Sequence, residues 1–401
     1  MLGISIISLM EIQFLQNNMN SFPDELIEFI REIYKTDDFI PLHEPRFQGN
    51  EKKYLLDAID STFVSSVGEY VDKFEKLVAN FLGVKYAIAT TNGTSALHTS
   101  LLLMEVESDD EVITQSLTFV ATCNAIKYCN ASPIFVDIEK STLGLCPESL
   151  KNFLELNTEI RNDGFCWNKG TNKRIKACIP MHNFGHPARI DEIVKICKTY
   201  NIKVIEDSAE SLGSFYKNKH TGLYGDIAIL SFNGNKIITT GGGGMIITNN
   251  TELAKKAKHI TTTAKKSHPW LFIHDQLGFN YRLPNLNAAL GCAQMEQLES
   301  FIKIKRALAK SYADWFMKTD YKFIKEPINA KSNYWFNCFL VKDREERDSI
   351  LEYTSKNNVM TRPAWTPMHS LEMYKNCQKT DLKNTIWLEE RLINIPSSVV
   401  A

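Results

Sequence analysis

The sequence predicts an α/β fold in which helices cover both faces of a mostly parallel sheet. Two observations support this class. Short β-rich runs alternate with helical stretches between residues 86 and 248, and after residue 286 the pattern changes to helices and strands without that alternation. With 401 residues, 44% of them hydrophobic and 23% charged, the chain is long enough for a large domain and a smaller one.

Seven runs of β-branched and apolar residues are the predicted strands of the sheet. They are Tyr86–Thr90, Glu111–Thr114, Pro133–Asp137, Ala177–Met181, Lys203–Glu206, Ile227–Phe232 and Met245–Thr248. The helical stretches between the earlier runs include Ser95–Leu103, Phe119–Tyr128 and Arg189–Tyr200. The last two runs are close together in the chain, so these two strands need not be parallel.

Three segments are expected along the chain. They are a helical extension over residues 1–38, a large domain over residues 39–285 and a small α+β domain over residues 286–401. One long helix is predicted at the start of the small domain, over residues 286–318. The predicted elements that follow it are a strand at Trp335–Val341, a helix at Arg344–Asn357 and a strand at Val359–Thr361.

Composition excludes several classes of function. The net charge of −1 gives no electrostatic footprint for nucleic acid. Nine cysteines without a CxxC pair and nine histidines without an HExxH pattern predict no metal site and reduced thiols. The apolar N-terminus has no basic region and is broken by Glu11 and Gln13, which argues against a signal peptide or a membrane anchor. We expect a cytoplasmic protein.

Ligands of open α/β sheets bind beyond the carboxyl ends of the strands, so the residues that follow each strand are candidate site residues. Thr94 and Ser95 follow the first strand and open a helix, where free N–H groups favour a phosphate. The same residues also suit a simple helix cap. Phe119 follows the second strand and either stacks on a planar ligand or belongs to the core.

Two later strands end in charged residues. Asp207 and Glu210 follow the fifth strand, where an aspartate could pair with a cationic ring nitrogen or simply face solvent. Lys236 lies between the end of the sixth strand, at Ser231, and four glycines, Gly241 to Gly244. The glycines lead into a strand rather than a helix, so they do not form a dinucleotide loop. An amine held there could form a Schiff base, and the whole set matches pyridoxal phosphate (PLP).

Five motifs in order resemble the DegT/DnrJ/EryC1/StrS family of PLP-dependent sugar aminotransferases. They are NGTSAL, LTFVAT, EDSAESLG, SFNGNKIITTGGGGMIITN and GFNYRLPNLNAALG. The opening PLHEPRFQGNEKKYL and SSVGEYVDKFE resemble the LegC branch of that family. The resemblance implies PLP-dependent transferase fold type I, similar to aspartate aminotransferase, with a mainly parallel seven-stranded sheet and a smaller α+β domain.

The resemblance also implies roles for residues of the site. Lys236 would bond covalently to the cofactor, Asp207 would bind its pyridine nitrogen, and Phe119 would stack on its ring. Glu210 would lie near the 3-hydroxyl, where many relatives have Gln. Thr94, Ser95 and Ser231 would hold the phosphate, and Asn280 would reach the phosphate in the other subunit of a homodimer.

Contacts to the substrate are also expected from the resemblance. Arg282 would suit the diphosphate of a nucleotide sugar, because its guanidinium offers a fork of donors. Arg362 would bind either a donor carboxylate or the nucleotide. His182 and His369 lie in segments that resemble those near the sugar and the nucleotide, although packing in the core explains both residues equally well.

The expected reaction is transamination from L-glutamate to a 4-keto-6-deoxy nucleotide sugar, of the UDP-4-keto-6-deoxy-N-acetylglucosamine type, for a bacterial surface glycan. The alternatives are a GDP-linked 4-keto sugar of the perosamine type and a 3-keto sugar. A PLP-dependent dehydratase is a rival, but such relatives carry His at the position of Lys236. An NAD(P)-dependent oxidoreductase would need a GxGxxG loop, which this chain lacks.

Overall fold

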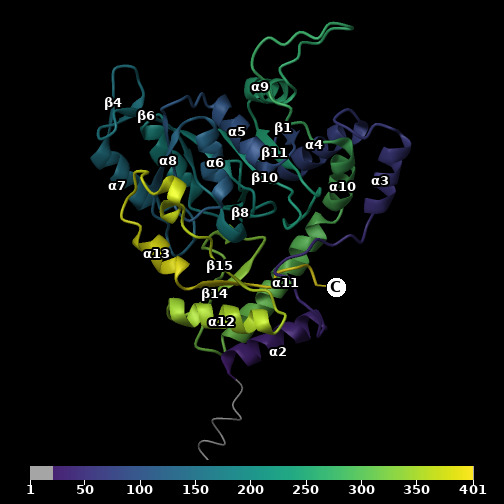
Figure 1. The fold of residues 1–401 in the computed structure, drawn as a ribbon, viewed down its shortest axis with the longest axis vertical. Helices are drawn as coiled ribbons and strands as arrows, with labels where there is room; N and C mark the ends of the chain where they lie inside the picture. Colours follow the sequence, from purple (N-terminus) through teal and green to yellow (C-terminus); the bar gives the residue numbers. More distant parts are fainter. Residues whose placement is uncertain (1–20, 401) are drawn as a thin grey trace, which may run out of the picture.

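The computed structural model describes residues 21–400, so most of the expected extension over residues 1–38 lies outside the described residues. Seven strands form the main sheet in the order β1-β11-β10-β7-β6-β2-β3 (Figure 1). They are β1 (Tyr86–Thr90), β2 (Glu111–Gln115), β3 (Ser132–Val136), β6 (Lys173–Ile179), β7 (Lys203–Asp207), β10 (Ile227–Ser231) and β11 (Gly244–Thr248). Only β11 is antiparallel to its neighbours. The predicted mainly parallel sheet of seven strands is confirmed.

Both faces of the sheet are covered by helices. Ile246 of β11 packs with α5, α6 and α9, whereas its neighbours Met245 and Ile247 pack with α4 and α10 on the opposite face. Such alternation is the two-residue period of a strand that is buried on both sides. The helices around the sheet are α3 (Glu51–Asp60), α4 (Glu69–Leu82), α5 (Gly93–Leu103), α6 (Val120–Tyr128), α7 (Pro147–Asn157), α8 (Ile190–Thr199), α9 (Thr251–Thr261) and α10 (Asn285–Met295).

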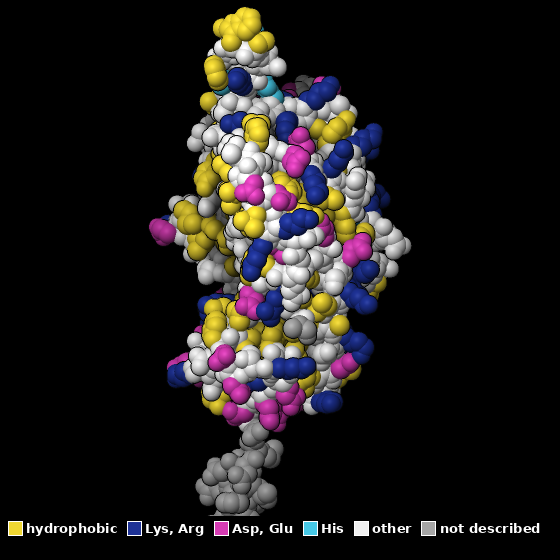
Figure 2. All heavy atoms as spheres, turned by 90° about the vertical axis from the view of Figure 1, so that its right-hand side faces the viewer, with side chains coloured by type: hydrophobic (Ala, Val, Ile, Leu, Met, Phe, Trp, Pro, Cys, Tyr) yellow, Lys and Arg dark blue, Asp and Glu magenta, His cyan; other side chains and the backbone are white. Residues whose placement is uncertain are grey.

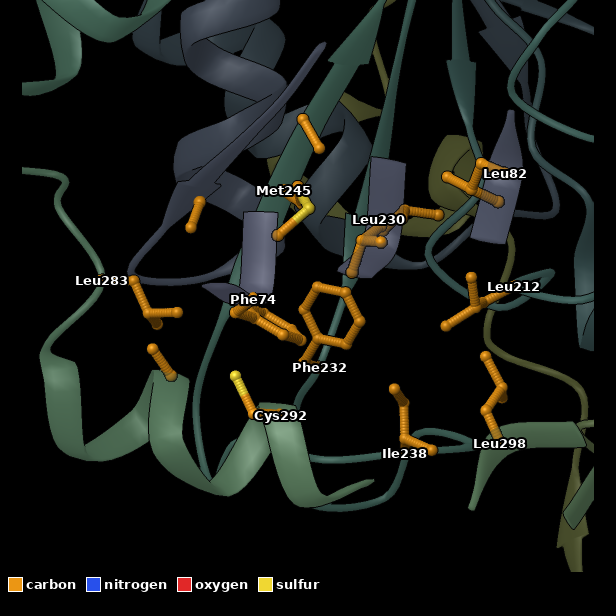
Figure 3. Close-up of a cluster of buried hydrophobic side chains, with 14 of the residues drawn as sticks. Phe74, Leu82, Leu212, Leu230, Phe232, Ile238, Met245, Leu283, Cys292 and Leu298 are labelled. Carbon is orange, nitrogen blue, oxygen red and sulfur yellow. The ribbon is translucent and has the colours of Figure 1, made fainter. Parts of the chain in front are cut away.

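The core between the sheet and α4 is built on aromatic packing. The rings of Phe74 and Phe232 meet edge to face with centroids 5.0 Å apart, and both side chains are fully buried (Figure 3). Burying one such side chain contributes about 1.5–3 kcal/mol to folding. Because Phe232 directly follows β10, this packing fixes the start of the loop that carries Lys236.

A second sheet, which is antiparallel, has the strand order β12-β14-β16-β15 and lies in the lower part of the molecule in Figure 1. Its strands are β12 (Lys322–Phe323), β14 (Asn337–Leu340), β15 (Arg362–Pro363) and β16 (Leu392–Ile395). The helices α11 (Leu298–Phe316), α12 (Arg344–Lys356) and α13 (Lys383–Glu389) belong to the same part of the chain. The small C-terminal sheet agrees with the expected fold type.

Helix α2 (Phe22–Tyr34) packs on this second part. Leu26 and Ile30 are fully buried in one cluster with Tyr312 of α11 and Ile350 of α12. The ring of Phe22 stacks on Tyr321 with centroids 3.7 Å apart. The described part of the expected helical extension therefore contains α2, with its apolar face buried.

The prediction of a single helix over residues 286–318 is wrong. The structure has α10 and α11, separated at Glu296 and Gln297. Helix α10 packs closely on α4, because a Cβ at Gly291 would lie 2.7 Å from the Phe74 ring. The division of the chain near residue 286 stays a proposal, and this packing favours a boundary closer to residue 297.

Short strands complete the fold. They are β4 (Thr158–Ile160), β5 (Cys166–Asn168), β8 (Phe215–Tyr216), β9 (Lys219–His220) and β13 (Ala330–Lys331). All nine cysteines lie within the described residues, and none is in a disulfide. Within residues 21–400, every helix is too short or too polar to cross a membrane.

Candidate active site

A cavity of about 830 Å³ lies at the carboxyl edge of the main sheet. Asp207 and Ser231 end the neighbouring strands β7 and β10, and both line it. Arg362 of β15 and Asn394 of β16 line the same cavity from the second sheet. The position is the one expected for the ligand site of an open α/β sheet.

The amine of Lys236 is held inside this cavity. Its Nζ donates a hydrogen bond to Oε1 of Glu210 at 3.1 Å and lies 3.9 Å from the centroid of the Trp335 ring. The side chain is only 11% exposed. An amine fixed by a carboxylate and an aromatic face is positioned as a nucleophile toward the cavity.

Trp335 is a further residue of the site, for which the sequence pattern predicts only a place in a strand. Its indole Nε1 donates to the backbone oxygen of Asn235 at 2.7 Å, next to Lys236 in the chain. Its own backbone oxygen accepts from Nζ of the buried Lys305 at 3.2 Å, and burial lowers the pKa of that amine to about 7. Trp335 therefore holds the loop of Lys236 from the second part of the molecule.

Glu210 is a buried carboxyl group beside Lys236. Its Oε2 accepts from the backbone N–H of Phe184 at 2.9 Å. Burial raises the pKa of Glu210 to about 7, although the ammonium of Lys236 acts in the opposite direction. The group can therefore hold or release a proton near neutral pH.

Asp207 faces the cavity from the end of β7 and is 2% exposed. Its Oδ2 accepts from the Thr122 hydroxyl at 2.8 Å, and its Oδ1 accepts from the N–H of Ala209 at 3.2 Å. Burial raises the pKa of this carboxyl, and these hydrogen bonds oppose the rise. A cationic partner in the cavity would favour the ionised form further.

The neighbouring acid, Glu206, has a structural role. It is fully buried, and its oxygens accept from the N–H groups of Gly222, Tyr224 and Gly225 at 2.7, 2.5 and 2.6 Å. Burial opposes its ionisation, but the hydrogen bonds from His182 and from these amides outweigh burial and lower its pKa. Successive residues of a strand face opposite ways, so only Asp207 faces the cavity.

The start of α5 is shaped as a cradle for an anion. Asn92 caps the helix, with Oδ1 accepting from the N–H of Ser95 at 2.8 Å, and Thr94 lines the cavity. A Cβ at Gly93 would lie 3.2 Å from the Cβ of Ser231. Free N–H groups at a helix N-terminus favour a phosphate. The hydroxyl of Ser95, by contrast, lies 3.2 Å from Thr91 Oγ1, and Ser95 does not line the cavity, so its predicted phosphate contact is not supported by its position.

The four glycines bring backbone close to this cradle. A Cβ at Gly244 would lie 2.3 Å from the carbonyl carbon of Asn92, so β11 can approach the helix start only without a side chain. Gly241 has φ +79°, which other residues rarely adopt. The four glycines therefore form a turn in which backbone approaches a neighbouring segment.

Phe119 lines the cavity at the start of α6 and is 48% exposed. Its ring meets Trp365 with centroids 6.2 Å apart. The alternative that Phe119 belongs to the core is therefore wrong, because almost half of its surface is open. An exposed ring at a strand exit is positioned to stack on a planar ligand.

Two predicted substrate residues lie away from the cavity because their rings are engaged elsewhere. His182 is fully buried, with Nε2 3.2 Å from Glu206 Oε2 and Nδ1 accepting from the N–H of Ala188 at 3.1 Å. His369 has Nδ1 2.7 Å from the Ser116 hydroxyl. The positions of both histidines favour the alternative of packing in the core, and their substrate contacts stay predictions.

Asn280 and Arg282 also lie outside this cavity. Both belong to the segment that returns toward β1, where Asn280 pairs with Thr262 and Arg282 with Thr90. Asn280 is exposed, and Arg282 Nε is buried without a hydrogen-bond partner among residues 21–400. Arg362 is the one predicted substrate residue that lines the cavity.

The residues present fit pyridoxal phosphate. An amine, a buried carboxylate, an open aromatic ring and a helix start that accommodates an anion line one cavity of sufficient volume. Fold and site together define a PLP-dependent transferase of fold type I. Comparison with known proteins gives the family: residues 45–400 match the DegT/DnrJ/EryC1/StrS aminotransferase family, and the chain belongs to it. It is a PLP-dependent sugar aminotransferase.

Two relatives illustrate the similarity. The chain is 38% identical over 361 residues to a GDP-perosamine synthase of Escherichia coli O157:H7, covering 90% of this chain and 93% of that protein. It is 36% identical over 336 residues to the putative pyridoxal phosphate-dependent aminotransferase EpsN of Bacillus subtilis, covering 84% of each chain.

Solved structures agree with the fold. Helicobacter pylori PseC, an aminotransferase involved in the biosynthesis of pseudoaminic acid, has a TM-score of 0.81 and 24% identity, over 90% of this chain and 94% of that chain. At this level of identity the similarity concerns the fold alone.

Proposed function

We propose that this chain transfers the amino group of L-glutamate to the C4 ketone of a GDP-linked 4-keto-6-deoxy sugar of the perosamine type. The held amine of Lys236, in a cavity with Asp207, supports the reaction. The nucleotide and the sugar are inferred from relatives named GDP-perosamine synthase, including one of Vibrio cholerae at 35% identity over 364 residues.

A second candidate acceptor is the UDP-linked 4-keto-6-deoxy-N-acetylglucosamine expected from the LegC-like opening motifs. The relatives found favour the GDP-linked alternative. The two candidates differ in the base of the nucleotide, guanine or uracil, and are separated by experiment.

The residues of this chain would share the work as follows. Bound PLP supplies an electron sink for the carbon that loses its proton. Lys236 Nζ would take that proton and return it to the carbon on the other side of the amino nitrogen, and Trp335 would keep the amine in place. Asp207 would hold a proton on the ring nitrogen, and Glu210 would exchange one with the 3-hydroxyl. Thr94 and Ser231 would hold the phosphate while Phe119 covers the ring.

The test is an absorption spectrum of the purified, PLP-loaded protein before and after addition of L-glutamate. We expect the visible band to move to the near ultraviolet, and GDP-4-keto-6-deoxy sugar to restore it faster than the UDP-linked sugar. A 3-keto sugar serves as a further acceptor. Restoration by the UDP-linked sugar alone would replace the GDP proposal, and a spectrum unchanged by glutamate would exclude glutamate as donor.

The Lys236→Ala variant tests the assignment of the amine. Because the phosphate cradle and Asp207 are intact, the variant should still bind PLP, yet its turnover should fall at least about a thousandfold, since it lacks both the nucleophile and the proton carrier. Cofactor binding is measured by absorbance after dialysis, and turnover with glutamate and sugar. Normal turnover would contradict the assignment.

We also propose a homodimer with shared active sites. Trp270, Phe272 and Leu277 are 75%, 79% and 83% exposed on the segment that projects after α9, and Figure 2 shows hydrophobic side chains at its tip. Exposed apolar groups of this size favour burial against a partner. Asn280, at the base of the segment, would then reach the phosphate in the partner's cavity.

Asn280→Ala tests the shared site. We expect a dimer of unchanged mass by sedimentation equilibrium, with PLP affinity lower by about five- to tenfold because one hydrogen bond to an anion is lost. The double variant Trp270→Ser, Phe272→Ser should instead shift the protein toward monomer. A monomeric wild type, or full PLP affinity in Asn280→Ala, would count against the shared site.

A further inference from the structure

Two polar groups on the wall of the active-site cavity have no hydrogen-bond partner within the described part of the chain. Both ring nitrogens of His43 and Oδ1 of Asn394 are buried and unpaired, and both residues line the cavity. Buried polar atoms are almost always paired, and an orphaned one costs about 1–3 kcal/mol. Such atoms in a ligand cavity indicate groups that a ligand satisfies.

The backbone around His43 is held in place. Ile40 pairs with the segment at Val359, and the oxygen of Leu42 accepts from the N–H of Ser397 at 2.7 Å. On the other side of His43, the N–H of Glu44 donates to the Ser398 hydroxyl at 2.9 Å. The imidazole packs near Phe336, with ring centroids 6.3 Å apart. His43 is thus a fixed part of the wall.

Asn394 is fixed with equal firmness. It is 2% exposed in β16, and its Nδ2 donates to the backbone oxygen of Pro363 at 3.2 Å, which leaves Oδ1 without a partner. Asn394 pairs directly with Arg362 of β15, and directly opposed residues share a face of a sheet. Arg362 lines the cavity beside it.

The chemistry of these two groups suits an uncharged ligand. Burial lowers the pKa of the His43 imidazole well below its ordinary value, and the cations Lys305, Lys236 and Arg46 lower it further. A neutral imidazole offers one donor and one acceptor, and Asn394 Oδ1 offers another acceptor. Hydroxyl groups satisfy this set, whereas a carboxylate would leave both acceptors unpaired.

We propose that His43 and Asn394 form the subsite that binds the hydroxyl groups of the acceptor sugar ring. The inference deepens the proposed function and rests on it. The reacting amine lies in the loop that follows β10 of the main sheet. Asn394 lies in β16 of the second sheet, and the segment of His43 is hydrogen-bonded to the residues that follow β16, so the sugar would be held between the two sheets. A site built to pair with hydroxyl groups discriminates against sugars that lack them.

The experiment compares two ligands that differ only in the sugar. Calorimetry measures the Kd of GDP and of the GDP-linked 4-amino-4,6-dideoxy sugar for the PLP-loaded protein, or of the UDP pair if wild type binds that pair. In wild type the sugar-bearing ligand should bind more tightly than the free nucleotide. His43→Phe and Asn394→Leu should each reduce this ratio about tenfold, the loss of one hydrogen-bonded contact.

The control is His186→Phe. His186 is also buried, and neither of its ring nitrogens has a partner in the described chain, but it lies outside the cavity, so the ratio should not change. His43→Gln keeps a donor and an acceptor and should stay within about threefold of wild type, which guards against a fold defect in His43→Phe. Circular dichroism checks the fold of each variant.

The outcomes separate the two claims. A wild type that binds neither nucleotide sugar overturns the proposed function and this subsite together. An unchanged ratio in folded His43→Phe and Asn394→Leu overturns the subsite alone. Weaker binding of L-glutamate with an unchanged ratio would also overturn it, because the groups would then serve the donor carboxylate.

Discussion

Lys236 and Glu210 form a pair in which the carboxyl group has an unusual pKa. Burial moves the pKa of Glu210 from 4.5 to about 7, so part of the population is protonated at neutral pH. When the carboxyl is ionised it pairs with the ammonium of Lys236 at 3.1 Å. The charge of the cavity therefore changes near neutral pH.

Glu210 should make the cofactor-free protein less stable as the pH rises. Between pH 4.5 and 7 the folded state binds more protons than the unfolded state, so the free energy of unfolding falls across this window and is flat above it. The full effect is on the order of 3 kcal/mol. In urea unfolding from pH 5 to 8, the stability of wild type relative to Glu210→Gln should therefore decline as the pH rises, since groups that titrate in both proteins cancel from the difference.

The control for this prediction is Glu372→Gln, because the Glu372 side chain is 83% exposed. It should follow wild type at every pH. Parallel curves for Glu210→Gln and wild type would show that Glu210 does not titrate in this window.

The position of a residue relative to a strand end made several site residues predictable. Lys236, Asp207 and Ser231 follow apolar strands, and the carboxyl ends of parallel strands meet at one edge. No such local signal marks Trp335, His43 and Asn394. An aromatic residue in a strand, or a histidine between two prolines, can lie in a core, on a surface or in a cavity, so the sequence does not predict its position. These three residues reach the cavity through contacts between segments far apart in the chain.

At the scale of an element, the glycines before β11 set how closely it approaches α5. Gly244→Ala would bring a methyl group within 2.3 Å of the Asn92 backbone, so β11 or the helix start must move. We expect a loss of about 1–3 kcal/mol in stability, as for other overpacked sites. PLP affinity should also fall, because the displaced residues form the phosphate cradle.

Gly242→Ala is the matched control in the same motif. The nearest atom to its Cβ would be the Thr91 oxygen at 3.9 Å, an ordinary contact. This variant should match wild type in unfolding and in PLP titration by absorbance. Equal losses in both variants would mean that flexibility of the motif, rather than close approach at Gly244, is what matters.

The helices and strands that could be predicted are those whose position follows from the pattern of apolar residues. The seven strands are buried runs bounded by polar residues, and their bounds in the structure differ by a few residues from those predicted. The break between α10 and α11 was missed because helix-forming residues continue through Glu296 and Gln297. The break is set by packing, since α10 lies against α4 and α11 against α2.

The whole molecule carries buried histidines that should make it sensitive to acid. Burial lowers the pKa of His186 and His220 from 6.5 to about 4. Between pH 4 and 6.5 the unfolded state binds more protons than the folded state. The contribution of these histidines to the free energy of unfolding is therefore fully present above pH 6.5 and is lost as the pH falls toward 4. Each histidine accounts for a loss on the order of 3 kcal/mol.

The test compares urea unfolding of wild type and His186→Phe from pH 4.5 to 7.5. The stability of the variant relative to wild type should increase as the pH falls, because one of the two protonation sites is gone. Glu210 acts with the opposite sign in both proteins and cancels from the difference. Parallel curves would show that His186 is protonated as easily in the folded protein as in the unfolded chain.

The wall that contains His43 has a consequence for the order in which the protein is made. Through their backbone, residues 40–44 form hydrogen bonds with Asn358, Met360, Ser397 and Ser398, which lie more than 300 positions later in the chain. A nascent chain on the ribosome therefore carries Lys236 and its loop well before this wall has any partner. The main sheet can form during translation, whereas the complete cavity is assembled only when the last strand has been synthesised and docked.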